Sequence, residues 1–143
     1  MADPTILETN LSKSIKKFFW DNIYTTESIP VYFDRIYQDV DNAVLRWICV
    51  RTRNLEVAQV SSVELMVDLF TKRDAEGDLL TALRDTVFGY LLGTIELYDV
   101  SESAWPQIAA MKIFHSPDSG VVYLPDNGKM KTMISTLKWG AVY

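Results

Sequence analysis

The sequence predicts an α+β fold in a single domain of residues 1–143, with a mostly antiparallel sheet packed by two main helices. Its length of 143 residues suits one domain that buries roughly 70% of its unfolded surface. Apolar residues recur at helical spacing in two stretches and at alternate positions in several others. The stretches follow one another as helix, strands, helix and strands, with turns between consecutive strands. This order favours hairpins over alternating strand–helix units.

The first helix is predicted from Pro4 to about Tyr24. Asp3 before Pro4 is typical of an N-cap followed by proline at the first helical position. Apolar residues then recur every four positions, and the lysines lie off this stripe. The stripe consists of Leu7, Leu11, Ile15, Phe19 and Ile23. The pattern indicates an amphipathic helix that buries one side.

Strand signals follow the first helix. Residues 29–33 predict a short strand, which Pro30 restricts to a strand start or an edge. A turn-like run at 38–42 leads into residues 43–52, where both faces carry apolar side chains. That pattern indicates a central strand or an interface. Residues 53–59 are expected to connect it to the next strand as the tip of an extended hairpin.

The chain is organised around residues 61–93, a strand followed directly by a helix. Apolar side chains alternate along the strand, which predicts one buried face. They are Val63, Leu65, Val67 and Leu69. Charged residues and a glycine at 70–78 break the pattern, and apolar residues then recur at helical spacing. These are Leu80, Leu83, Val87, Tyr90 and Leu91. We expect this helix to cover the buried face of the strand and Gly93 to cap its C-terminus.

The last third of the chain predicts strands separated by turns. The expected strands are 94–100, 108–115, 121–124 and 129–139. Trp105 and Pro106 lie in a loop that enters the second of them. Turn-forming residues at 116–120 and 126–128 separate the remaining strands.

Composition and charge narrow the function classes. At 48% hydrophobic and 23% charged residues, the chain has the composition of an ordinary globular protein. The net charge of -5 argues against a dedicated nucleic-acid binder, which carries a basic footprint. Cys49 is the only cysteine, so a reducing compartment is the simpler interpretation. A signal-peptide pattern is missing and the apolar runs are short, so we expect a soluble intracellular product.

The residues offer little catalytic chemistry. Cys49 and His115 are the sole cysteine and histidine, so they form the one conceivable cysteine dyad. However, Cys49 shares the apolar face of its strand with Trp47, which predicts a small buried core side chain. Neither a phosphate-binding glycine motif nor a paired zinc-ligand spacing occurs. The sequence therefore predicts no enzymatic activity, no cofactor and no metal.

An acidic run before the second helix partly fits a calcium-loop template. The acidic positions are Asp74, Glu76, Asp78 and Asp85. Leu79 occupies the position where the template requires glycine, and the predicted helix runs through the would-be loop. Favourable interaction of carboxylates with the helix dipole explains the run better.

The order of the elements carries a resemblance to a known family. An N-terminal amphipathic helix precedes IPVYFD, then WICVRT, and then SSVELMVDLFTKRD running into LLTALRDTVFGYLLG. The chain ends in a strand with KWGAVY. Over nearly its whole length, this arrangement resembles the tail terminator (tail-completion) proteins of tailed bacteriophages. VELMVDLFTKRD is the most family-like segment, and the family has no catalytic signature.

The resemblance implies a virion structural protein at the head-proximal end of the tail, assembled in the host cytoplasm. It implies a ring, expected to be hexameric, that caps the tail tube, ends tube polymerisation and offers a docking surface to the head or neck. The implied partners are further copies of the chain, the tail tube protein and a neck or head completion protein. No membrane partner is implied.

DNA is expected to pass through the lumen of such a ring without specific binding. Six chains of net charge -5 give -30, which repels phosphates and suits transit rather than capture.

Other functions stay open at this point. Within the same class, the chain fits a head–tail joining protein or another minor tail protein of the neck. In different classes, it fits a small intracellular enzyme of unknown substrate or an intracellular adaptor. A ring of six identical chains in solution would favour the first class, and a monomer would favour the others.

A candidate subunit interface lies on the second face of strand 61–69. There Met66 is set between Glu64 and Asp68. In a ring, a neighbour would bury Met66 while the carboxylates pair with arginines, for which Arg46 and Arg51 are candidates. Alternatively, the first helix covers this face, or Met66 is a single exposed apolar group that needs no explanation.

Overall fold

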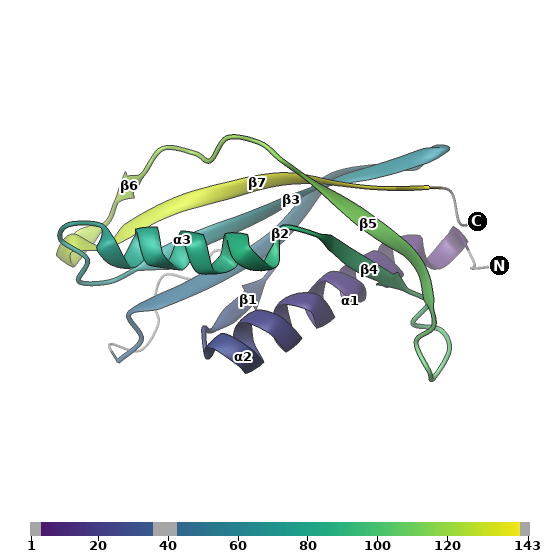
Figure 1. The fold of residues 1–143 in the computed structure, drawn as a ribbon, viewed down its shortest axis with the longest axis horizontal. Helices are drawn as coiled ribbons and strands as arrows, with labels where there is room; N and C mark the ends of the chain where they lie inside the picture. Colours follow the sequence, from purple (N-terminus) through teal and green to yellow (C-terminus); the bar gives the residue numbers. More distant parts are fainter. Residues whose placement is uncertain (1–3, 36–42, 141–143) are drawn as a thin grey trace.

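The computed structural model describes residues 4–35 and 43–140. It confirms the α+β class, with one curled, mostly antiparallel sheet and the helices on one of its faces (Figure 1). The strand order is β1-β2-β3-β7-β5-β4, and β6 pairs with β7. The predicted N-cap at Asp3 and the predicted turn at 38–42 lie outside the described residues.

The helices and strands largely follow the sequence pattern. The helices are α1 (Leu7–Phe19), α2 (Thr25–Glu27) and α3 (Asp78–Tyr90). The strands are β1 (Val31–Phe33), β2 (Arg46–Glu56), β3 (Val60–Thr71), β4 (Thr94–Tyr98), β5 (Gln107–His115), β6 (Val122–Tyr123) and β7 (Lys129–Gly140). Short 3₁₀ turns occupy Pro4–Ile6 and Pro125–Asn127. Paired strands run antiparallel except β1 and β2, which are parallel.

The β2–β3 hairpin is longer than the sequence predicts. Residues 53–56, expected as a connector, continue β2 past a register shift between Arg53 and Glu56. Of these residues, only Leu55 packs against the core, and its neighbours are exposed, so periodicity gives too short a strand signal there. Their backbone is held in the ladder by pairing with β3.

Gly93 does not cap α3, which corrects the prediction. The helix ends at Tyr90, and Leu91 follows with a φ of -99° while its N–H donates to the carbonyl of Phe88. The chain turns at this point because the Leu91 side chain enters the core, where it is fully buried. Gly93 simply precedes β4, and a left-handed cap is not needed.

The first helix buries its predicted stripe by changing its winding. All five stripe residues are buried. A spacing of four exceeds the 3.6 residues of an α-helical turn, so the stripe drifts by about 40° at each step. The chain winds more widely as a π-helix over Trp20–Tyr24, and this turn keeps Ile23 in the core.

Helix α1 also covers the edge of the sheet. Strand β4 is the last in the sheet order, so one side of its backbone has no strand partner. Ser14 Oγ accepts a hydrogen bond from Tyr98 N at 2.9 Å, and Asn10 Oδ1 accepts one from Val100 N at 3.0 Å. Both side chains are fully buried. These polar groups on the buried side of α1 therefore satisfy an edge that would otherwise be open to pairing.

Both main helices pack on the same face of the sheet (Figure 1). The main core joins the α1 stripe and the buried side of α3 to Ile48, Val50 and the four predicted residues of β3. The opposite face, which we call the helix-free face, carries a smaller cluster built on Trp47, Cys49 and Phe70. Apolar residues on both sides of β2 thus reflect a central strand, because β2 lies between β1 and β3.

Candidate functional site

The predicted interface residues lie mainly on the helix-free face. In the antiparallel register, Asp68 is opposite Cys49 and Met66 is opposite Arg51. Glu64, two residues before Met66 on β3, lies on the same face. Arg46 alternates with Trp47 and so shares the helix-covered face with Ile48. The structure thus brings Arg51 to the predicted face and leaves Arg46 on the other one.

The carboxylates of this face are paired within the chain. Arg51 Nε lies 3.0 Å from Asp68 Oδ2, and Arg51 Nη2 lies 3.3 Å from Asp68 Oδ1. Thr132 on β7 donates a hydrogen bond of 2.6 Å to Asp68 Oδ1. The Asp68 side chain is fully buried, whereas that of Arg51 is 37% exposed. Glu64 accepts hydrogen bonds from Arg53 and Asn54.

Met66 is already buried in the single chain, at 6% exposure. The sequence interpretation assigned its burial to a neighbouring subunit and the arginine pairs to a contact between chains. In the structure, the chain itself supplies both. The first helix is not what covers Met66, because α1 packs on the opposite face. The signal that sequence reasoning lacked was the register of β2 against β3.

What the helix-free face presents to a partner is a phenylalanine between two lysines. Phe114 on β5 is 44% exposed, and the ammonium groups of Lys112 and Lys138 lie 5.6 and 5.1 Å from its ring centre. The two lysines are direct register partners on β5 and β7. Neither forms an ion pair with a described residue. Like charges placed opposite each other destabilise a sheet, so this pair favours an acidic partner.

The cysteine dyad considered from the sequence is not assembled. Cys49 is fully buried on the helix-free face of β2, as predicted. His115 is on β5, with β3 and β7 in between, and it is opposite Ser135 on the helix-covered side. Its Nδ1 lies 3.3 Å from Ser135 Oγ and its Nε2 lies 2.9 Å from the Leu91 carbonyl oxygen. Ser135 is itself 2% exposed, which hides its hydroxyl from a substrate.

Burial of Cys49 gives a direct prediction. We expect a soluble thiol reagent to label Cys49 at least about a hundredfold more slowly in the folded protein than in denaturant, because reactivity requires an accessible thiolate. Mass spectrometry of the labelled chain over time measures this. Labelling at the same rate in both conditions would contradict the burial.

The acidic run before α3 serves as a helix cap. Asp74 is 4% exposed and accepts hydrogen bonds from Leu79 N at 3.0 Å and Leu80 N at 2.9 Å. The Thr71 hydroxyl donates to the same carboxylate at 3.0 Å. Burial by itself would raise the pKa of Asp74, but these hydrogen bonds and the charge of Lys129 bring its pKa below the usual value. Among the described residues, no three His, Cys, Asp or Glu side chains come together in a metal-binding group.

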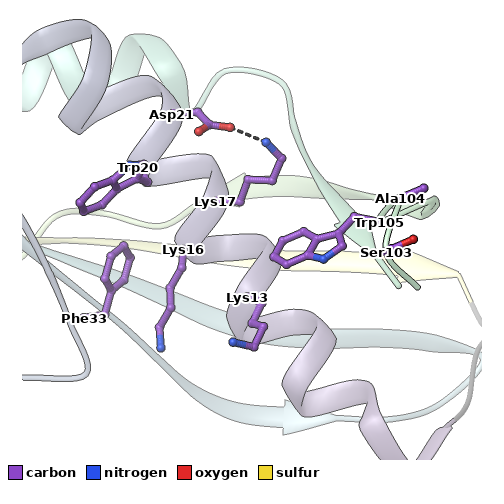
Figure 2. A pocket seen from close by; sticks show the side chains of 9 residues that line it. All are labelled: Lys13, Lys16, Lys17, Trp20, Asp21, Phe33, Ser103, Ala104 and Trp105. Carbon is purple, nitrogen blue, oxygen red and sulfur yellow. Dashed lines mark hydrogen bonds and ion pairs between the residues drawn. The ribbon is translucent and has the colours of Figure 1, made fainter. Parts of the chain in front are cut away.

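A groove of about 700 Å³ lies along the outward side of α1 (Figure 2). Its floor and ends come from three separate parts of the chain. The lining residues are Lys13, Lys16, Lys17, Trp20, Asp21, Phe33, Ser103, Ala104 and Trp105. In Figure 2 the lysines follow the helix, with Trp20 and Phe33 at one end and Trp105 at the other. The groove therefore has basic side chains between two aromatic ends.

The three lysines of the groove differ in their partners. Lys17 pairs with Asp21, and this hydrogen bond raises the pKa of Lys17. Lys16 has its ammonium group 5.9 Å from the centre of the Phe33 ring. Neither Lys13 nor Lys16 forms an ion pair with a described residue. These two are three positions apart on α1, so their like charges repel and an added carboxylate between them would be stabilised.

Unusual backbone occurs at both ends of the groove. Trp105 has a φ of 46°, a left-handed conformation that is a genuine outlier for a bulky residue. Such strain costs on the order of 1–3 kcal/mol and tends to cluster at binding sites. Trp20 begins the π-helical turn, stacks on Tyr24 with ring centres 4.2 Å apart, and is 49% exposed. Sequence reasoning noted only that the lysines lie off the buried stripe and that Trp105 lies in a loop.

Comparisons with family models and with curated proteins find no match to this chain. Among solved structures, one that carries a reference number in place of a descriptive name matches with a TM-score of 0.58 at 7% sequence identity. The match covers 90% of this chain and 95% of the other. At that identity the likeness shows the fold alone. No helix in the described part of the chain is both long and apolar enough to cross a membrane.

Proposed function

We propose that the chain is a structural protein of a phage virion, the tail terminator that forms a ring on the head-proximal end of the tail tube. Its resemblance to that family and its α+β fold support the proposal. In this role the ring, a hexamer, caps the tube, ends tube polymerisation and presents a surface to the neck or head completion protein. The protein acts by assembly and carries out no reaction.

The observation that carries this proposal is the helix-free face of the sheet. A broad face of long, paired strands suits an extended protein surface better than a small substrate. Phe114 supplies an exposed aromatic group there, and Lys112 and Lys138 supply positive charge without an acidic partner among the described residues. We propose that this face docks on the tube or the neck. DNA passes through the lumen without specific binding, since the net charge of each chain is -5.

Two measurements on the purified full chain test this function. Light scattering after size exclusion should give the mass of a ring, about six chains, and electron microscopy should show its outline. Added to growing tubes of the tail tube protein, the chain should stop elongation, so that mean tube length falls as its concentration rises. A chain that stays monomeric and leaves tube length unchanged would contradict the proposal and favour an enzyme or adaptor.

A matched pair of variants locates the docking face. Phe114→Asp should weaken capping at least about tenfold while rings still form, because it removes the exposed ring and its carboxylate would pair with Lys112 and Lys138, which then offer no free charge to an acidic partner. Ala82→Asp, on the exposed side of α3, should cap as the natural chain does. Equal capping by both variants would exclude the helix-free face as the docking surface.

A further inference from the structure

We infer that the ring contact is head-to-tail, with the groove on α1 of one subunit receiving the β6 segment, residues 121–126, of the next. This inference rests on the proposed ring and adds which surfaces build it. The groove offers two unpaired lysines between aromatic ends, so its occupant must carry an acidic side chain together with apolar ones. A second copy of the chain presents such a segment.

The β6 segment exposes an apolar run that the single chain covers only in part, with the Lys129 ammonium group 5.4 Å from the centre of the Tyr123 ring. Val121, Val122 and Tyr123 are 40%, 50% and 77% exposed. Three consecutive exposed apolar residues are unusual on a soluble protein unless a partner covers them. Strand β6 pairs with β7 through Val122 with Met130 and Tyr123 with Lys129. Its apolar side chains are therefore available to another chain.

An exposed carboxylate follows the apolar run. Asp126 is exposed and forms neither an ion pair nor a hydrogen bond through its side chain with a described residue. Its φ of 57° places it at the tip of a tight turn, after Pro125. Seated in the groove, Tyr123 would stack against an aromatic end while Asp126 meets Lys13 and Lys16. Each surface thus supplies what the other lacks.

The two surfaces lie at opposite ends of the molecule. Figure 1 shows β6 beside the start of α3 at the left end of the longest axis, while α1 and the β4–β5 loop that carries Trp105 lie toward the right. Contacts between different patches at opposite ends repeat from copy to copy, and they close into a ring when the rotation allows. The exposed tip of the β2–β3 hairpin, with Val57 and Val60, lies toward the same end as α1, so it fits this head-to-tail repeat less well.

A strand of nucleic acid fits the groove less well than a protein segment. Single-strand binding needs a positive track that follows several phosphates. Here Asp21 already neutralises Lys17, which leaves two lysines on a chain of net charge -5. Two ammonium groups match one or two carboxylates of a peptide.

A charge swap tests the contact. Lys16→Glu and Asp126→Lys should each raise the protein concentration at half assembly at least about tenfold, because like charges then face each other across every contact. The double variant should recover most of the ring. Lysine at position 126 strains the left-handed backbone equally in the single and the double variant. Any recovery of assembly in the double variant therefore comes from the restored charge pair. Asp85→Lys, on the exposed side of α3, and Lys112→Glu, on the helix-free face, change charges outside both contact surfaces and should assemble as the natural chain does.

Sedimentation of each variant across protein concentrations distinguishes the outcomes. If the natural chain forms rings and neither single variant weakens them, this contact is wrong while the proposed function stands. If both single variants weaken the rings and the double variant does not recover them, the charge pair is also wrong. The contact is likewise wrong if Val57→Asp abolishes the rings while Lys16→Glu and Asp126→Lys leave them intact. A natural chain that stays monomeric overturns both the contact and the proposed function. Binding of oligothymidylate in the groove, lost in Lys16→Glu without any change in assembly, would replace the protein occupant with a nucleic acid.

Discussion

Replacement of Asp74 by alanine is expected to lower the free energy of unfolding by about 2 kcal/mol, because one side chain caps the start of α3. Its carboxylate accepts from two backbone N–H groups of the first helical turn, at 3.0 and 2.9 Å, and from the Thr71 hydroxyl. The N-cap residue itself is Gly77, which has no side chain to do this. For a chain of this length the melting temperature should fall by about 7 °C. Thermal unfolding followed by circular dichroism measures it.

The same carboxylate gives a pH dependence with a defined sign. The pKa of Asp74 is lowered in the folded state, so its contribution is complete above the unfolded pKa of about 4 and is lost as the pH falls through the folded value. The stability difference between the natural chain and Asp74→Asn should therefore shrink on acidification from pH 6. Glu76→Ala, an exposed carboxylate two residues away, is the matched control and should change stability by less than about 0.5 kcal/mol. A difference that grows on acidification would contradict the capping role.

Local patterns are enough to predict most of this fold. The stripe from Leu7 to Ile23 is buried as its spacing indicates, and the alternating residues of β3 are buried in the core that α1 and α3 share. Short-range signals fail where packing decides instead. The π-helical turn at Trp20–Tyr24 brings a stripe with a spacing of four back to the core, and no local residue preference announces it. Likewise, the end of α3 is set by burial of Leu91, which made Gly93 a misleading signal.

The candidate sites depend on contacts between distant segments, and these are what a sequence leaves open. The groove brings Lys16, Phe33 and Trp105 together from a helix, an edge strand and a loop. Sequence reasoning named Arg51 as a candidate partner of the β3 carboxylates but assigned the pair to a contact between two chains. The exact length of the β2–β3 hairpin, which the sequence pattern does not fix, decides whether the pair can form within one chain. Once the register is set, Arg51 and Asp68 meet within the chain.

Replacement of Arg51 by methionine is expected to be the most damaging single change, at about 3 kcal/mol of unfolding free energy. Methionine preserves the apolar stem of the side chain but leaves the fully buried Asp68 carboxylate with the Thr132 hydroxyl as its only side-chain partner among the described residues. An uncompensated buried charge is costly, whereas removing both charges together is often neutral or stabilising. The double variant Arg51→Met, Asp68→Leu should therefore recover most of the lost stability. Urea unfolding monitored by tryptophan fluorescence gives the free energies of unfolding of the natural chain, the single variant and the double variant.

The dependence on protein concentration separates a pair within one chain from a pair between subunits. For a pair within the chain, the loss caused by Arg51→Met should be the same at low and high protein concentration, since unfolding of each chain carries the whole effect. Arg53→Met is the matched control, because Arg53 is 53% exposed and its pairing with Glu64 is largely hydrated. It should cost less than about 1 kcal/mol. If the loss in Arg51→Met instead disappears when the chains are diluted to monomers, Asp68 takes its arginine from a neighbouring subunit, and the helix-free face becomes the ring contact.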